Sequence, residues 1–185
     1  MGNGKLFIIS GASGVGKSTV LRRVMEQRED LLFSVSATTR KPRPDEQEAV
    51  NYYFVSKEIF REMMDRGEFL EYDAHMDNFY GTPKGQLEEK LQRGHVILDT
   101  EPNGAFTVQK ARPDAVLIFI APPSMEEVER RLRKRGDTDE EQIQIRLQRA
   151  SWEMEQSPKY NYIVINDQVD PCAEEILNII AREAD

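Results

Sequence analysis

The stretch Gly11-Ala12-Ser13-Gly14-Val15-Gly16-Lys17-Ser18 fits the pattern G-x-x-x-x-G-K-S/T, a phosphate-binding loop between a strand and a helix. Its glycines let the backbone curl so that successive N–H groups point at one anion. The lysine of this pattern reaches the β- and γ-phosphates of a nucleotide, and the hydroxyl after it ligates Mg²⁺. The helix expected next adds its positive end. The stretch therefore predicts a bound nucleoside triphosphate.

The flanking sequence supports this interpretation over a plain glycine-rich turn. Residues 5–10 (KLFIIS) form an apolar run, and Lys17 to about Gln27 has helical periodicity with its apolar residues on one face. We predict that ATP is bound by Gly11 to Ser18 and Thr19, with Lys17 as a catalytic group and Ser18 as the magnesium ligand. The loop alone does not choose the phosphate acceptor, because hydrolases, motors and many kinases share it.

Further apolar runs at 95–99, 115–120 and 161–165 are short and rich in branched residues, as strands buried on both faces tend to be. Helical stretches separate them, and this alternation predicts an α/β fold with a parallel sheet flanked by helices. Helix-boundary signals are Thr82-Pro83 and Gly94 for one helix, the capping boxes Ser124/Glu127 and Thr138/Glu141, and Asp170-Pro171 before the last helix.

Two segments interrupt the alternation of strands and helices. Residues 33–81 predict a small mixed insertion with strands and one short helix, and residues 122–156 predict a charged helical one. We therefore expect a single domain over residues 1–185, with a core of 1–32, 82–121 and 157–185.

The amino-acid composition limits the classes of binding partner that the protein is expected to have. The net charge of −8 provides no general attraction for nucleic acid, and no apolar run approaches the roughly 20 residues of a membrane span. One cysteine excludes an internal disulfide and a cysteine-based zinc site. The first residues lack the features of a signal peptide, so we expect a cytoplasmic protein with small-molecule partners, monomeric or weakly self-associating.

Candidate acceptor residues occur in three places. Arg40 and Arg43 lie beside several hydroxyls, and two arginine forks suit a phosphate dianion. Tyr80 and Thr82 flank a glycine, and Glu71 lies among aromatic residues. A carboxylate accepts from both N1–H and the 2-amino group of guanine, whereas adenine presents an acceptor at N1. Losing such a pair costs on the order of a few kcal/mol.

Over essentially its whole length the sequence resembles the guanylate kinase family. The resemblance rests on ISGASGVGKST, SVSATTRKPRP, FVS, GEFLE, YGTP, RRLRKRG and the final VIND, in the order found in that family. It implies a P-loop kinase core with a GMP-binding insertion at 33–81 and a mobile helical lid at 122–156. It also implies Mg²⁺-dependent transfer of the γ-phosphate of ATP to GMP, giving ADP and GDP.

The resemblance assigns roles residue by residue. It implies that the GMP phosphate is bound by Arg40, Arg43, Tyr52 and Tyr80. It implies that the base is bound by Ser36, Glu71 and Thr82, and that Gly81, Asp99 and Glu101 also belong to the GMP site. Arg135 and Arg146 are the implied catalytic lid arginines, with Arg131 as a third candidate, and Asn166 is the implied adenine contact. The two tyrosines could instead be packing residues, and the lid arginines surface charges.

One segment, Leu98-Asp99-Thr100-Glu101-Pro102-Asn103-Gly104, departs from the family pattern of an acid, Ile, Asp, an apolar residue, Gln and Gly. Glu101 stands where the family has an aspartate that helps bind the guanine amino group. Asp99 could orient water on the magnesium or serve the guanine amine. The alternatives to the kinase are an inactive guanylate-kinase-like binding module and a kinase for another nucleoside monophosphate.

Overall fold

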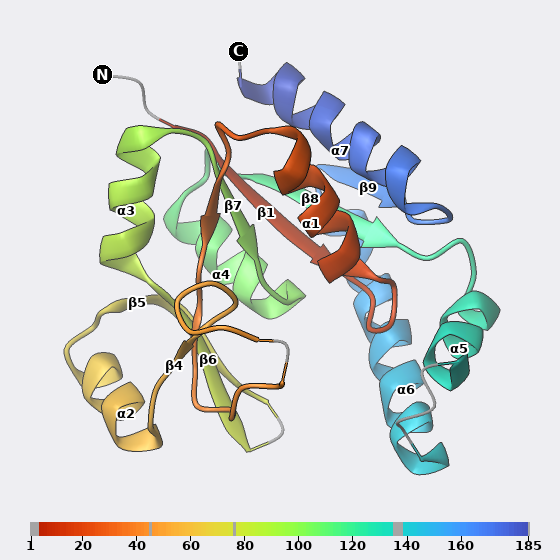
Figure 1. Cartoon of the computed structure of the whole chain (residues 1–185), viewed down its shortest axis with the longest axis horizontal. Coiled ribbons are helices and arrows are strands. Elements are labelled where there is room, and N and C mark those ends of the chain that lie inside the picture. The colour runs from red at the N-terminus through yellow and green to blue at the C-terminus, as the bar shows by residue number, and fades with distance from the viewer. Residues whose placement is uncertain (1–3, 45, 76, 135–138, 185) are drawn as a thin grey trace.

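The computed structural model describes residues 4–44, 46–75, 77–134 and 139–184 (Figure 1). Its central sheet is parallel, with the strand order β2-β7-β1-β8-β9 among these residues. The strands are β1 (Leu6–Gly11), β2 (Leu32–Ser34), β7 (Val96–Asp99), β8 (Val116–Ala121) and β9 (Tyr162–Ile165). The predicted α/β fold is confirmed, and the carboxyl ends of all these strands meet at one edge of the sheet.

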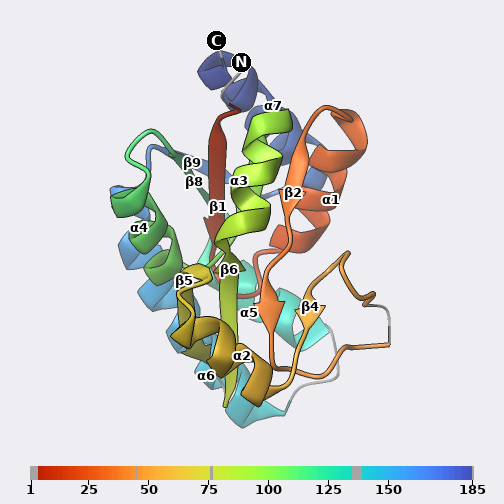
Figure 2. The same ribbon diagram turned by 90° about the vertical axis from the view of Figure 1, so that its left-hand side faces the viewer.

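Helices cover both faces of this sheet. Figure 2 shows α1 on one side of β1 and α4 on the other, while α3 covers the end near β2. Helix α7 packs beside α1. These helices are α1 (Lys17–Gln27), α3 (Lys84–Arg93), α4 (Pro102–Ala111) and α7 (Val169–Ala184). Every residue of β1 and β8 is buried, which explains why these strands read as continuous apolar runs.

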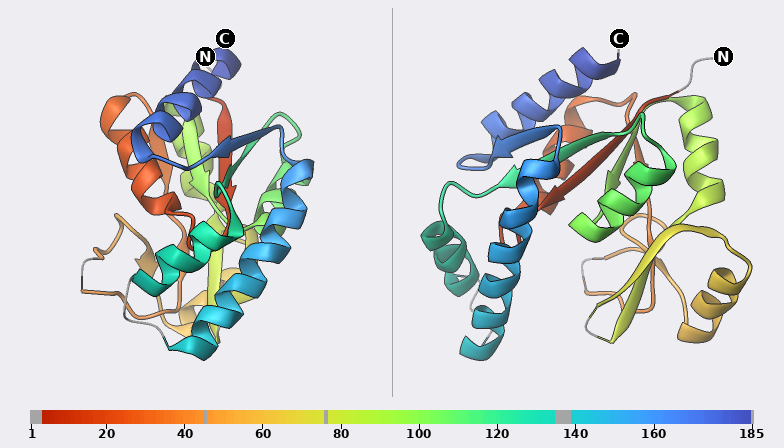
Figure 3. Two further views of the ribbon diagram at one scale, coloured as in Figure 1. Left: turned by 90° about the vertical axis from the view of Figure 1, so that its right-hand side faces the viewer. Right: turned by 180° about the vertical axis from the view of Figure 1, so that it is seen from behind.

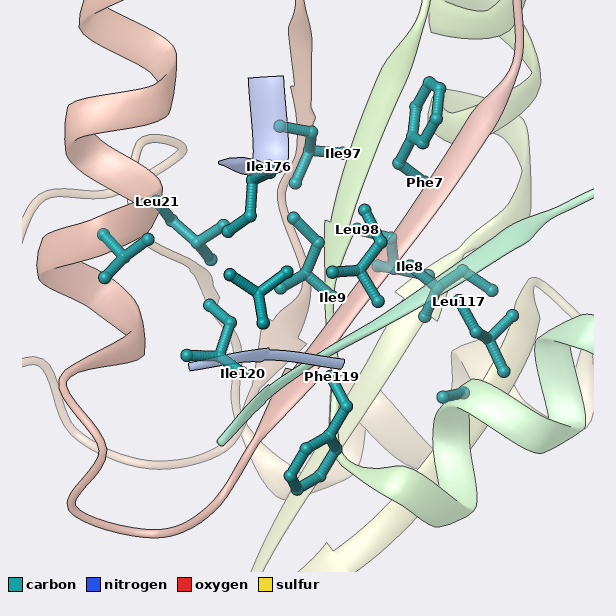
Figure 4. Packing of buried hydrophobic residues seen from close by; sticks show 14 of the residues in the cluster. Phe7, Ile8, Ile9, Leu21, Ile97, Leu98, Leu117, Phe119, Ile120 and Ile176 are labelled. Atoms are coloured by element: carbon teal, nitrogen blue, oxygen red, sulfur yellow. The ribbon is translucent and has the colours of Figure 1, made fainter. Parts of the chain in front are cut away.

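The sheet and its helices share one hydrophobic core. Figure 4 shows Ile9 and Leu98 of the sheet beside Leu21 of α1 and Ile176 of α7. Ile9 and Leu98 are fully buried. Burying a side chain of this size stabilises the fold by about 1.5–3 kcal/mol relative to exposure. The core therefore fixes the strand ends that carry the site.

A second, mixed sheet lies below the first in Figure 1, with the order β4-β3-β6-β5. Its strands are β3 (Ala37–Thr38), β4 (Tyr53–Phe54), β5 (Phe69–His75) and β6 (Asn78–Pro83), and α2 (Lys57–Asp65) packs on it. The ring of Phe60 from α2 stacks on Phe69 and Phe79, with centroids 4.4 and 5.4 Å apart. This small aromatic core is separate from the main one.

The charged segment forms two helices, α5 (Met125–Lys134) and α6 (Glu140–Gln156), followed by the 3₁₀ turn Ser157–Lys159. They pack against each other and lie across from the second sheet (Figure 3). None of the helices in the described ranges is long and apolar enough to cross a membrane.

Three helix and strand bounds lie a residue or two away from the positions that the sequence suggested. Strand β2 crosses the expected division at 32/33, and β6 runs on through the division at 81/82. Thr82 is therefore a strand residue, and Pro83 is the N-cap of α3. The pairing of Thr82 with Glu71 across β5 and β6 holds it in the sheet. Helix α7 begins at Val169, before the predicted start.

The capping predictions fared differently. Ser124 accepts the Glu127 N–H at 3.2 Å, as predicted, although the Glu127 carboxylate pairs with Arg130 and Arg131. Thr138 lies outside the described residues. The N-cap found for α6 is Asp139, whose side chain accepts the Gln142 N–H at 2.9 Å.

Candidate functional site

The glycine-rich loop connects β1 to α1 at the carboxyl edge of the sheet. Gly14 and Gly16 have φ angles of 80° and 91°, in the left-handed region that glycine adopts without strain. Gly16 is also the N-cap of α1, and no side chain caps this helix. No side chain of the described residues therefore accepts from the first N–H groups of α1, at the helix end where the dipole favours negative charge.

Lys17 forms an ion pair with Asp99, the last residue of β7. The parallel register of β1 and β7 places Asp99 opposite Ile9, close to the start of the loop. Burial alone would lower the pKa of Lys17, but the charge of Asp99 and its hydrogen bond, with smaller effects of Tyr52 and Glu101, raise it above its usual value. Lys17 is therefore a cation held at the strand ends.

Two side chains hold the loop through hydrogen bonds to its Val15 carbonyl. Asn166 donates to the Val15 carbonyl at 2.7 Å and is 2% exposed. Arg131 donates to the same carbonyl at 3.0 Å and to the Asn166 carbonyl at 3.0 Å. In this structure both residues thus contact the loop itself, and the adenine contact expected of Asn166 stays a prediction.

A third contact to the loop comes from α6. Glu153 of α6 accepts the Ser13 N–H at 2.6 Å, and it also accepts from Arg149 at 3.1 Å. Arg149 in turn forms an ion pair with Glu101. Sequence reasoning missed Glu153 and Arg149. Their spacing of four residues on a helix was the available signal for a pair, but nothing local pointed to Ser13 or Glu101.

In the second sheet, Glu71 and Thr82 face each other across β5 and β6. The Thr82 hydroxyl donates to one Glu71 carboxylate oxygen at 2.6 Å, and Glu71 is 8% exposed. Desolvation raises the pKa of Glu71, the Thr82 hydrogen bond opposes this, and the charges of Asp73 and Glu101 add to the rise. A buried carboxylate with one partnered oxygen suits a ligand that brings further donors.

Gly104 at the start of α4 borders this carboxylate. A Cβ atom added there would lie 2.4 Å from Thr100 Oγ1 and 2.9 Å from Glu71 Oε2. The backbone of α4 can therefore approach Glu71 only because position 104 is a glycine, which has no side chain.

The expected phosphate-binding residues lie further along the second sheet. The Arg40 guanidinium makes a forked pair with Glu46 at 2.8 and 2.9 Å and lies 5.5 Å from the Tyr52 ring centroid. The Tyr52 and Tyr80 rings meet edge to face at 6.1 Å. Burial raises the pKa of Tyr52 to about 12, with a further contribution from the charge of Asp99. Arg40 and both tyrosines therefore form one cluster near Asp99.

The other predicted acceptor residues are less closely gathered. Arg43 is exposed, and its backbone N–H donates to Glu46 at 2.8 Å. Ser36 is half-buried beside β3, where its carbonyl accepts the Tyr53 N–H at 2.9 Å. Gly81 is buried in β6, and a Cβ atom there would lie 2.8 Å from the Phe69 ring.

The structure describes one of the two arginines that were predicted to be catalytic. Arg135 lies outside the described residues. Arg146 is half-buried on α6 and makes no hydrogen bond or ion pair with the described part of the chain. Arg131 and Arg149 differ from it, because their guanidinium groups form hydrogen bonds or ion pairs within the chain.

The donors beside the loop fit magnesium. Ser18 is exposed in the first turn of α1, and Asp99 lies next to Lys17, so oxygen donors of the kind that Mg²⁺ prefers are present. Within the described ranges, no group of three or more histidine, cysteine or acidic residues could hold a metal by itself. The arrangement therefore suits magnesium that arrives with a nucleotide and keeps phosphate and water ligands.

Comparisons with known proteins show which family the whole chain resembles. The guanylate kinase family model matches residues 3–183. The guanylate kinase of Prochlorococcus marinus is 42% identical over 177 residues, covering 95% of this chain and 96% of that protein. The one from Clostridioides difficile is 44% identical over 181 residues, covering 97% and 88%. The crystal structure of guanylate kinase from Anaplasma phagocytophilum superposes with a TM-score of 0.81 at 32% identity, covering 100% of this chain and 88% of that one.

Proposed function

This chain belongs to the guanylate kinase family of nucleoside monophosphate kinases, and we propose that it transfers the γ-phosphate of ATP to GMP with Mg²⁺, giving ADP and GDP. The observation that carries the choice of acceptor is the buried Glu71 carboxylate, with one oxygen held by Thr82. The loop supports ATP as donor. GMP and ATP are thus the proposed partners, and a cytoplasmic location and a monomeric or weakly associating state stay predictions.

Guanine recognition follows from the state of Glu71. Guanine brings N1–H and the 2-amino group, and both can donate to a carboxylate. Adenine would place its N1 acceptor against the same oxygens and leave a desolvated charge unpaired, which costs on the order of a few kcal/mol. We assign base recognition to Glu71 and Thr82, with Ser36, Gly81 and Glu101 bordering the base.

The GMP phosphate is assigned to the cluster of Arg40, Tyr52 and Tyr80, with Arg43 approaching from the exposed loop. Arg40 already binds the carboxylate of Glu46 in forked geometry, the geometry that suits phosphate. The phosphate of GMP would compete with Glu46 for this guanidinium. The phosphate oxygen would then face the triphosphate held at Lys17.

Transfer itself needs positioning and charge neutralisation rather than a proton relay. Lys17 exchanges its contact with Asp99 for the β- and γ-phosphates, and the N–H groups at the start of α1 bind the same anion. Arg146, with Arg135 as the second predicted lid arginine, offsets the charge that spreads over the transferring group. Ser18 would hold the magnesium that arrives with ATP, which would supply positive charge to the phosphates. Asp99 would support that site or accept from the guanine amine.

A lid completes this proposal. An open site would leave ATP exposed to water, so closure of residues 122–156 over both substrates would assemble the site and limit hydrolysis. Small-angle scattering with and without both nucleotides tests the motion. An unchanged radius of gyration with both sites occupied would contradict closure.

A coupled assay of ADP release from Mg-ATP tests the reaction, with GMP, AMP, UMP or no acceptor. We expect ADP with GMP and a background rate otherwise. Bound ATP without ADP release in any mixture would instead indicate a binding module. Faster turnover with AMP or UMP would indicate a kinase for another nucleotide.

A further inference from the structure

Three charged side chains join the two halves of the site. Arg149 of α6 forms an ion pair with Glu101, which follows β7, and donates to Glu153 Oε1 at 3.1 Å. The second oxygen of Glu153 accepts the Ser13 N–H of the phosphate loop at 2.6 Å. A continuous path thus runs from the segment expected at guanine to the loop expected at ATP.

Burial makes this path more than a surface ion pair. Glu153 is 3% exposed, and desolvation raises its pKa, opposed by the Ser13 hydrogen bond and the charge of Arg149. A carboxylate in such a place needs a partner, because an unpaired buried charge is strongly destabilising. Arg149 is that partner, and its own side chain is 27% exposed.

The charge of Glu101 also influences ionisable groups of both the second sheet and the phosphate loop region. Its charge contributes to the raised pKa of Glu71 and of Glu153, and to that of Lys17. Without Arg149, the negative charges of Glu101 and Glu153 would stand unbalanced beside a loop that has to hold a triphosphate. One guanidinium therefore controls the electrostatics of two binding regions.

We propose that Arg149 is a positioning residue that couples the acceptor side to the phosphate loop, through Glu101 on one side and through Glu153 and the Ser13 amide on the other. This inference rests on the proposed function for its substrates. It also gives the Glu at position 101 a role: its carboxylate reaches Arg149 and so connects the end of β7 to the lid helix.

The test is a double-mutant cycle with Glu101→Gln, Arg149→Gln and both together, read as separate KM values for GMP and ATP. Arg149→Gln should raise both KM values about 5- to 10-fold. Glu101→Gln should raise the KM for ATP although position 101 lies on the acceptor side. This second effect should disappear in the Arg149→Gln background, because the connection is already cut.

Two further variants keep the test decisive. Arg23→Gln is the matched control, because Arg23 also pairs with two carboxylates, Glu26 and Asp170, but on α1 and α7 away from the site. It should leave both KM values unchanged. Arg149→Lys should restore part of the affinity for ATP, because it keeps the positive charge. Arg149→Met, which also removes the charge, replaces Arg149→Gln in the cycle if the latter does not fold.

Additive effects of the two substitutions would overturn the inference. An unchanged KM for ATP in the Glu101→Gln variant would also overturn it. If the unmodified protein does not phosphorylate GMP, the proposed function fails. The same cycle is then measured as dissociation constants for ATP and GMP, where coupling supports the inference and additivity overturns it.

Discussion

The phosphate loop and the acceptor site are built in different ways. The loop is one continuous segment whose shape follows from glycines at positive φ and from the strand and helix beside it. The acceptor residues come from several strands and are held by paired side chains, such as Arg40 with Glu46 and Glu71 with Thr82. Substitutions in the loop should therefore remove the chemistry, whereas those in the acceptor site should change selectivity and stability.

The largest effect is expected for Lys17→Met in the loop. It removes the cation that meets the phosphates and leaves Asp99 without its ion-pair partner. We expect kcat to fall about 10²- to 10³-fold, as for loss of one strong electrostatic contact to the transition state. Steady-state kinetics at saturating GMP measures it. A fall in kcat of less than about tenfold would contradict the role of Lys17, and a large rise in the KM for GMP would blur the contrast between the regions.

A smaller effect is expected for Glu71→Gln on the acceptor side. The amide keeps one oxygen acceptor but presents a donor where guanine also donates, so kcat/KM for GMP should fall about 10²-fold. The dissociation constant of ATP should stay the same. Thr82→Val is the companion variant, with a fall of about tenfold from the loss of one hydrogen bond. Equal weakening of ATP binding would show that the two regions are not separable in this way.

The next prediction concerns packing against Glu71. Gly104→Ala would put a methyl group 2.9 Å from Glu71 Oε2 and 2.4 Å from Thr100 Oγ1. We expect the free energy of unfolding to fall by about 1–3 kcal/mol, as for overpacking, and the KM for GMP to rise. Chemical denaturation measures the first quantity.

Gly85→Ala is the matched control for Gly104→Ala. An added Cβ at Gly85 in α3 meets nothing within 4 Å. Alanine should there stabilise the helix by up to about 1 kcal/mol. Loss of stability at both positions would mean that the crowding at Glu71 is not the cause.

The smallest expected effect is on the pH dependence of stability. The folded-state pKa of Glu71 is raised above 4.5, so its contribution is fully present below the unfolded value and is lost as the pH rises through the folded one. The Glu71→Gln variant should therefore gain stability relative to the unmodified protein as the pH rises through this window. Thermal unfolding across pH 4.5 to 8 measures the difference, and a gap that does not widen with pH would contradict the desolvation of Glu71.

The sequence predicted the parts whose signals are local. The loop, four core strands and the helix starting at Lys17 follow from patterns within a few residues, and the structure confirms them. Strands β2 and β3 are only three and two residues long, too short for a period to show. Their place in the sheets depends on partners elsewhere in the chain.

The supporting contacts of the site were beyond prediction for a similar reason. Ser13 and Glu153 are 140 positions apart, and Arg149 and Glu101 are 48 apart. Charged residues on a helix such as α6 usually face solvent, so nothing local separates the buried Glu153 from its exposed neighbours. Only the fold brings these groups together.

The central claim is that the acceptor site reads guanine through the buried Glu71 carboxylate. The most direct test compares kcat/KM for GMP, IMP and AMP, because IMP keeps the N1–H donor but lacks the 2-amino group. The account predicts the order GMP, then IMP, then AMP, with Glu71→Gln compressing the differences. An equal kcat/KM for AMP and GMP would contradict it. So would ratios of kcat/KM among the three nucleotides that stay the same in Glu71→Gln.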